Sequence, residues 1–308
     1  MSTRTRRHGR REFRRRLRGS LALSCVLLAA SAIASAQALG APAAQSPPRK
    51  LGVSTNWAGY VALPAARRGS RFSSVSGSWT QPTATCTPGH AAYSAVWVGL
   101  GGYNPGSRGL EQIGTDADCG ASGHAVYDAW LELLPAAPVN LKLRVRPGDR
   151  LVASVTVKGH GVTLRINDLT TGRRSWKTLR STHIDTSSAE WIVEAPSECT
   201  GASTCEPLPL TDFGEVLFSG ATATAGAHTG PITDPRWSAS ALELQQRLAG
   251  AVRGIAGDRA APTRTLTVAA PTASSAPYGA FSVSWQQQPV ELERENPTTL
   301  PSSADGAP

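Results

Sequence analysis

Short segments rich in valine, threonine and aromatic residues recur through residues 53–288 and constrain the fold more than any other feature. Gly, Pro, Asn or Asp turns separate them, which is typical of an all-β sandwich or closed barrel. Only residues 241–257 could also form a helix, and we favour a strand followed by a loop there. The expected strands lie within residues 56–63, 71–82, 93–102, 125–135, 141–145, 150–159, 161–172, 174–182, 189–196, 213–224, 241–246, 263–270 and 280–288.

Both ends of the chain differ in composition from this central region. Residues 1–36 combine an arginine-rich start, an apolar run and Ala34-Ser35-Ala36, the pattern of an export signal peptide. Arg10-Arg11-Glu12-Phe13 resembles a twin-arginine motif, so this export route is one possibility. Residues 37–52 are typical of a linker or short pro-segment, and residues 289–308 of a disordered tail. We therefore expect one secreted domain over residues 53–288.

Removal of the signal changes the charge of the protein. The signal contains nine of the 31 basic residues and one of the 22 acidic ones, which leaves 22 basic against 21 acidic residues. The net charge of +9 thus falls to about +1. We therefore expect no nucleic-acid partner, and no membrane association after signal cleavage. A soluble monomer is the expected form.

Four cysteines remain in the mature protein, an even number that suits an oxidising compartment. Of three possible pairings we favour Cys86 with Cys119 and Cys199 with Cys205, because the second pair closes a short polar loop. Zinc binding is disfavoured, since no Cys-x-x-Cys pair is present. We predict no metal and no cofactor.

Two of the expected strands, and residues 110–119 if they are extended, carry polar and aromatic residues on a face where a core-facing strand would be aliphatic. Gln112 shares a face with Asp116, Trp130 shares one with Glu132, and Glu194 lies opposite to Trp191 and Val193. Together these strands indicate a cleft for an extended ligand. Glu190 would share the face of Glu194, and we interpret it as structural or facing solvent.

The sequence argues against several hydrolytic mechanisms. It contains neither Gly-x-Ser-x-Gly nor His-Glu-x-x-His, the motifs of common serine hydrolases and metalloproteases. Glu190 and Glu194, about 13 Å apart along one strand, are too distant to act as a glycosidase pair. An amide beside a carboxylate suits acyl transfer instead, because the carboxylate can activate water while the amide stabilises the oxyanion.

Six segments of the chain resemble, in sequence and in order, segments of the glutamic peptidases, the eqolisin family. The resemblance is to a secreted, bacterial-type member of that family. The six segments are "STNWAGYV", "VWVGLGG", "LEQIGTD", "YDAWLELLP", "AEWIVEAP" and "LTDFGEVLFSGA", spread over residues 54–221. The resemblance implies an antiparallel β-sandwich of two sheets of about seven strands, jelly-roll or concanavalin-like. It also implies an endopeptidase that acts on proteins or peptides in acid, without metal or cofactor.

The resemblance assigns roles to particular residues. It implies that Glu194 is the general base and acid, and that Gln112 orients water and stabilises the oxyanion. The residues implied to form or flank the substrate cleft are Asn56, Trp57, Gly59, Trp97, Asp116, Trp130 and Glu132.

Two features keep other interpretations open. Fungal members of the family have Asp where this chain has Gly101, so we expect the pKa of Glu194 to be raised less and activity to extend to milder pH. The alternative function is a secreted, lectin-like module that binds carbohydrate or peptide through its aromatic residues. That alternative requires Trp97 and Trp130 but not the Gln112/Glu194 dyad.

Overall fold

The computed structural model describes residues 51–64, 70–200, 205–248, 264–273 and 279–286. The expected signal, nearly all of the linker and the expected C-terminal tail lie outside these residues. The first strand, β1 (Leu51–Ser54), starts at the end of the expected linker and pairs with β18 in parallel. Within the described ranges, no helix is long and apolar enough to cross a membrane.

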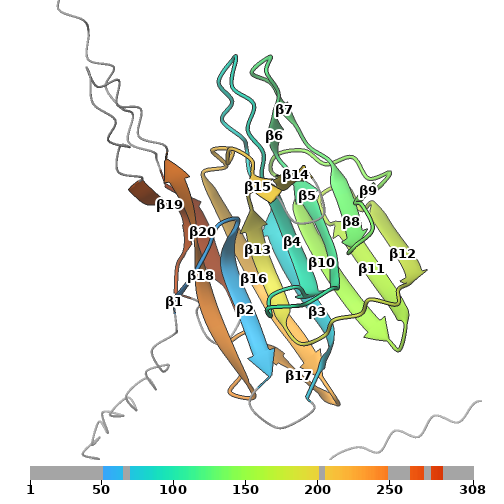
Figure 1. The fold of residues 1–308 in the computed structure, drawn as a ribbon. Helices are drawn as coiled ribbons and strands as arrows, with labels where there is room; N and C mark the ends of the chain where they lie inside the picture. Colours follow the sequence, from blue (N-terminus) through green and yellow to red (C-terminus); the bar gives the residue numbers. More distant parts are fainter. Residues whose placement is uncertain (1–50, 65–69, 201–204, 249–263, 274–278, 287–308) are drawn as a thin grey trace, which may run out of the picture. The chain divides into compact units, whose positions relative to one another are not determined.

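The strands form one continuous hydrogen-bonded sheet that folds over into two packed layers (Figure 1). The front layer contains, in spatial order, β18 (Trp237–Leu248), β2 (Trp57–Pro64), β13 (Ala189–Glu194), β4 (Ala95–Gly101), β5 (Leu110–Asp116), β8 (Ala129–Leu133) and β9 (Val139–Asn140). The back layer contains β12 (Arg174–Arg180), β11 (Gly161–Asp168), β10 (Arg150–Lys158), β3 (Phe72–Thr80), β16 (Glu215–Ala225) and β20 (Phe281–Trp285).

The remaining strands connect or extend these layers. The strand β19 (Arg264–Pro271) pairs with β18 on one side and β20 on the other, so the two expected sheets are hydrogen-bonded through it into one. β17 (His228–Pro231) extends β16 as a hairpin. Two short hairpins stand apart from the main sheet: β6 (Asp118–Cys119) with β7 (Ala125–Val126), and β14 (Ser197–Cys199) with β15 (Cys205–Pro207).

The predicted strands are confirmed with one exception. Residues 141–145 are not a strand, although Leu141, Leu143 and Val145 are buried and the lysine and arginines that alternate with them are exposed. This segment keeps the two-residue alternation of a strand but lacks a continuous hydrogen-bonding partner. Residues 241–248 continue β18, so the strand interpretation was right over its described part.

The core fills the space between the layers. Val96, Val98 and Ile113 of the front layer and Val155 and Leu164 of the back layer are fully or almost fully buried in it. Each such side chain contributes about 1.5–3 kcal/mol by leaving water. Polar groups also tie the layers together, since the Trp191 indole donates to the Ser76 carbonyl at 2.8 Å. Trp191 and Val193 thus face inward, as predicted.

The opposite face of the front layer positions the functional groups. Alternation along each strand and the register between strands place outward-facing residues in rows across β13, β4, β5 and β8. These rows are Glu190, Gly99, Gln112, Glu132; Ile192, Trp97, Gly114, Trp130; and Glu194, Ala95, Asp116.

Candidate active site

A cavity of about 550 Å³ lies on this outward face. It brings together seven of the nine residues predicted for the dyad and the cleft: Asn56, Trp57, Gln112, Asp116, Trp130, Glu132 and Glu194. The other two, Gly59 and Trp97, do not line the cavity. A Cβ at Gly59 would lie 2.2 Å from the carbonyl oxygen of Trp191, so this glycine allows β2 to approach β13 closely.

Glu194 occupies one end of the cavity and is held by two donors. The Trp97 indole Nε1 donates to Oε2 at 2.8 Å, and the Asn56 amide donates to Oε1 at 3.0 Å. Burial raises the pKa of Glu194 to about 7, with a smaller contribution from the nearby Glu132 carboxylate, while the indoles of Trp97 and Trp57 and the Asn56 amide oppose the rise. This carboxyl group can therefore accept or donate a proton over a range well above that of an ordinary glutamate.

Gln112 lies two strands away from Glu194 in the same cavity. Its side-chain amide donates to Oε2 of Glu132 at 2.5 Å, and Gln112 is only 4% exposed. Burial raises the pKa of Glu132, and the hydrogen bond from Gln112 lowers it in part. Glu132 thereby fixes the orientation of the Gln112 amide. This contact uses one of the two N–H groups of the amide and leaves the other for a second acceptor.

Asp116 adds another carboxyl group on the row of Glu194. It accepts a 2.6 Å hydrogen bond from the Trp130 indole. Burial, followed by the like charge of Asp118, raises the pKa of Asp116 to about 8. Burial also raises the pKa of Asp118 to about 6. The cleft is thus lined by carboxyl groups that hold protons more tightly than they would in water.

Trp97 lies beneath the cavity and is completely buried. Its ring packs edge-on against Trp57, with centroids 5.0 Å apart. Its register partner, Gly114, leaves room for it, because a Cβ at position 114 would lie 2.6 Å from the Cβ of Trp97 and 2.4 Å from the Val96 carbonyl. The glycine of "QIGTD" is therefore required for the position of the tryptophan that binds Glu194.

Of the two roles expected for Glu190, structural or facing solvent, the solvent-facing one is wrong. Glu190 shares the face of Glu194 as expected, but it is completely buried. Burial raises its pKa well above the ordinary value; Ser188 opposes the shift, and the charges of Asp185 and Glu111 add to it. The loops on either side of these strands come together here, as the bond from Asn104 to Ser187 shows. The alternation of residues along β13 alone could not predict that Glu190 is buried in this way.

Gly101 is not a direct neighbour of Glu194. The register partner of Glu194 on β4 is Ala95, six positions earlier in the strand. Gly101 has a φ of +84°, and a Cβ there would lie 2.5 Å from the carbonyl oxygen of Asp185. Glycine therefore suits both the backbone and the close approach of Asp185. That the pKa of Glu194 is lower than in Asp-containing relatives stays a prediction.

The favoured cysteine pairing is confirmed, with Cys86–Cys119 and Cys199–Cys205 both bonded. The second disulfide lies at the cavity, so the β14–β15 hairpin borders the cleft. Sequence reasoning missed this location, and it missed Tyr93 and Asp118 as lining residues. The sequence could have indicated Asp118, because it follows Asp116 by two positions and so would share its face on a strand. No sequence pattern indicated Tyr93 or the hairpin.

No group of three or more His, Cys, Asp or Glu side chains is arranged to hold a metal ion in the part of the chain that the structure describes. The polar side chains that line the cavity are chiefly carboxyls, indoles and the amides of Asn56, Gln112 and Asn140. A carboxyl with a raised pKa near an amide can transfer protons and stabilise negative charge. The fold and cleft together define a β-sandwich protein equipped for acyl-transfer hydrolysis.

Comparison with known families agrees with this chemistry. The model of the peptidase A4 family matches residues 55–249, which is more than half of the chain. The chain therefore belongs to the peptidase A4 family, the glutamic peptidases, and is a hydrolase that acts on peptide bonds.

Individual relatives are distant in sequence. Aspergillopepsin-2 of Aspergillus niger is 28% identical over 217 residues, covering 63% of this chain and 71% of that protein. Scytalido-glutamic peptidase, solved with a peptide-based transition-state analogue, has a TM-score of 0.57 at 24% identity, covering 76% of this chain and 99% of that one. SCP-B, an eqolisin solved with the tripeptide Ala-Ile-His, has a TM-score of 0.54 at 22% identity, with the same coverages. Both structures share the fold of this chain.

Proposed function

We propose that the protein is an exported endopeptidase in which Glu194 and Gln112 form the catalytic dyad. The observation that carries the proposal is their position in one cavity, where Glu194 is held by two donors and has a raised pKa, and Gln112 is held by Glu132. Peptide-derived ligands in the solved relatives support a peptide substrate for this cleft.

In the first step, ionised Glu194 removes a proton from a water molecule as the water oxygen attacks the scissile carbonyl carbon. The carbonyl π electrons move to oxygen, giving a tetrahedral oxyanion. The free N–H of the Gln112 amide donates to this oxyanion, while the other N–H remains bound to Glu132. Trp97 and Asn56 keep the Glu194 carboxylate pointed at the water.

In the second step, the protonated Glu194 returns its proton to the amide nitrogen of the substrate. The C–N bond breaks as the carbonyl re-forms, releasing an amine and a carboxylic acid. A carboxyl group with a pKa of about 7 suits both roles better than one near 4.5, because neither protonation state is strongly disfavoured in mildly acidic solution.

Export and oligomeric state belong to the same proposal. The two disulfides are typical of an oxidising compartment, and the arginine-rich apolar start of the chain is typical of an export signal. We propose that the enzyme acts as a monomer.

The test is cleavage of a denatured protein from about pH 2 to 8, by the wild type and by Gln112→Ala and Glu194→Gln, with pepstatin and a chelator present. We expect wild-type cleavage despite both inhibitors, and a loss of about a thousandfold or more in each variant with unchanged folding. Full activity in either variant would remove its residue from the dyad.

Glu215→Gln serves as the matched control, because this exposed glutamate lies on β16 of the back layer and does not line the cavity. It should cleave like the wild type. A protein that binds peptides but never cleaves them would instead be a binding module.

A further inference from the structure

A second hollow, of about 450 Å³, lies on the outer face of the back layer. Its floor and rim are formed by residues of β10, β11 and β12 that alternate with the buried core residues of these strands. They are Ser154, Thr156, Lys158, Gly161, Thr163, Arg165 and Thr178. The peptidase cleft lies on the outer face of the other layer, so the two sites are on opposite sides of the sandwich.

The register between strands arranges this face in a definite order. The central row contains Thr156, Thr163 and Thr178, side by side across the three strands. The row on one side contains Lys158 and Arg180, which are both register partners of Gly161. The row on the other side contains Ser154, Arg165 and Trp176. Cations therefore border a row of hydroxyl groups on both sides.

The hydroxyl groups of the floor are paired in a way that leaves hydrogen-bonding capacity. Thr163 Oγ1 and Thr178 Oγ1 are 3.1 Å apart, and Ser74 Oγ and Thr156 Oγ1 are 3.0 Å apart. A hydroxyl group has one donor and two acceptor positions, so each pair keeps positions for a ligand.

The segment of the chain that contains β10, β11 and β12 has a strong excess of positive charge. Residues 139–183 contain ten lysines and arginines and two aspartates. All ten cations are exposed, and none belongs to either of the two ion pairs found among the described residues. The cations are Lys142, Arg144, Arg146, Arg150, Lys158, Arg165, Arg173, Arg174, Lys177 and Arg180.

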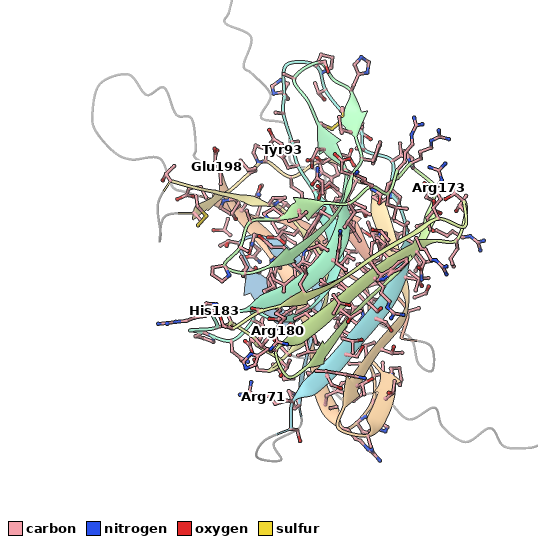
Figure 2. The ribbon with its side chains drawn as sticks, turned by 90° about the vertical axis from the view of Figure 1, so that its right-hand side faces the viewer. Arg71, Tyr93, Arg173, Arg180, His183 and Glu198 are labelled. Carbon is pink, nitrogen blue, oxygen red and sulfur yellow. A yellow bond between two sulfur atoms is a disulfide. The ribbon has the colours of Figure 1, made fainter. Side chains whose placement is uncertain are left out.

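The two aspartates do not offset this field at the surface. Asp149 and Asp168 are both buried and accept hydrogen bonds from turn backbone, Asp149 from Arg146 at 2.8 Å and Asp168 from Thr170 at 2.8 Å. Figure 2 views the molecule from the right-hand side of Figure 1, where β12 forms the edge of the sheet, and labels Arg173 and Arg180 near the two ends of that strand. Among the described residues, carboxyl groups gather at the cleft and basic residues in the segment of β10, β11 and β12.

An aromatic ring completes the face. Trp176 is 56% exposed, and the Arg174 guanidinium lies 5.8 Å from the centroid of its ring. An exposed indole next to hydroxyl groups offers a flat apolar surface for a sugar ring. The position of Arg174 over the ring is a cation–π arrangement, which helps to orient both groups.

We propose that this face binds an anionic polysaccharide and so anchors the peptidase outside the cell with its cleft facing away. Lysine and arginine would bind carboxylate or sulfate groups, the serine and threonine row would bind sugar hydroxyls, and Trp176 would stack on a sugar ring. Single-stranded nucleic acid fits less well, because it requires successive aromatic platforms and this face has one.

The test measures binding of the secreted protein, purified after removal of the expected signal, to heparin, polygalacturonate and a single-stranded DNA, at about pH 6 and about 0.15 M salt. Heparin carries both sulfate and carboxylate groups and polygalacturonate carboxylates only, so binding to heparin alone would assign recognition to sulfate. We expect binding to at least one polysaccharide that is tighter than binding to DNA. Absence of polysaccharide binding, or tighter binding of DNA, would overturn the proposal.

Two matched variants separate this site from general charge attraction. Lys158→Gln/Arg165→Gln should weaken binding about tenfold, whereas Arg108→Gln/Arg236→Gln, which removes equal charge elsewhere, should change it less than about twofold. Equal losses in both would contradict a site on this face. Peptidase activity should stay unchanged in both, so failure here is distinct from failure of the catalytic proposal.

A charge-neutral variant tests the sugar contacts. Thr163→Val/Thr178→Val keeps the charge and approximate shape of the floor but removes its hydroxyl groups. We expect polysaccharide binding to weaken about fivefold with no change in DNA binding. Unchanged polysaccharide affinity would show that only charge is recognised and would overturn the assignment to a polysaccharide.

Discussion

The Trp97 indole nitrogen lies 2.8 Å from Oε2 of Glu194, a bond between a buried ring and the carboxyl group that borders the cleft. The two residues come from the neighbouring strands β4 and β13, in adjacent register rows. Trp97 is completely buried and packs over Gly114, which holds the ring beside the carboxyl group. The bond favours the ionised form of Glu194 and so lowers its pKa against the effect of burial.

Trp97→Phe removes this hydrogen bond and keeps most of the packing. The pKa of Glu194 should then rise further, because a donor to the ionised form is lost. We expect kcat/KM at mildly acidic pH to fall about tenfold and the acidic limb of its pH profile to move to higher pH. An unmoved limb would show that Trp97 has a packing role only.

The wild-type pH profile follows from Glu194 itself. The base form is populated as pH rises through its pKa of about 7, so kcat/KM should rise well above pH 4.5. Steady-state kinetics on a fluorogenic peptide from about pH 3 to 8 measures this limb. A profile confined below about pH 4 would contradict the raised pKa, since an ordinary glutamate titrates near 4.3.

Substitutions of Glu132 test whether this residue orients the Gln112 amide or has only a structural role. Glu132→Ala leaves the Gln112 amide without its 2.5 Å acceptor and should lower kcat about tenfold, while Glu132→Gln, with a neutral acceptor, should recover part of this loss. Both changes remove a like charge near Glu194, so the acidic limb should move to lower pH. Equal kcat in the two variants would argue against orientation of the amide.

Stability should fall as the pH rises from the acid range. Burial raises the pKa of Glu111 to about 8, and that of Glu190 is also raised. A group whose folded pKa is raised stabilises the protein fully below its unfolded value near 4.5, and this contribution is lost as pH rises toward the folded pKa. The free energy of unfolding should therefore decrease between about pH 4.5 and 8, by up to about 1.4 kcal/mol per pH unit for each group.

Urea unfolding across this pH range measures the slope, and Glu111→Gln is the informative variant. It keeps an acceptor for the Asp185 backbone amide and removes one titrating group, so its slope should be shallower. An identical slope in the variant would assign the pH dependence to other residues.

Gly114→Ala tests the packing beneath the cleft. The added methyl group would meet the Val96 carbonyl at 2.4 Å, so we expect a loss of about 1–3 kcal/mol in stability together with reduced activity. Gly120→Ala is the control, because a Cβ there finds only ordinary contacts, the nearest at 3.7 Å. Thermal unfolding compares the two, and equal melting temperatures would contradict the steric argument.

The sequence by itself determined which residues share a face of each strand. Alternation placed Gln112 with Asp116 and Trp191 with Val193, and the order of motifs indicated the family, because both are properties of neighbouring positions along the chain. The short closure between Cys199 and Cys205 likewise favoured the pairing that the structure contains.

Only the tertiary structure decided which strands are neighbours and what covers them. Register across β13, β4, β5 and β8 assembles the cleft from residues far apart in the sequence, and distant loops meet over the completely buried Glu190. The basic hollow arises in the same way, since a near-neutral total charge does not specify where charges gather. Pairing between distant strands and burial by distant loops depend on the whole packed chain, so no local pattern encodes them.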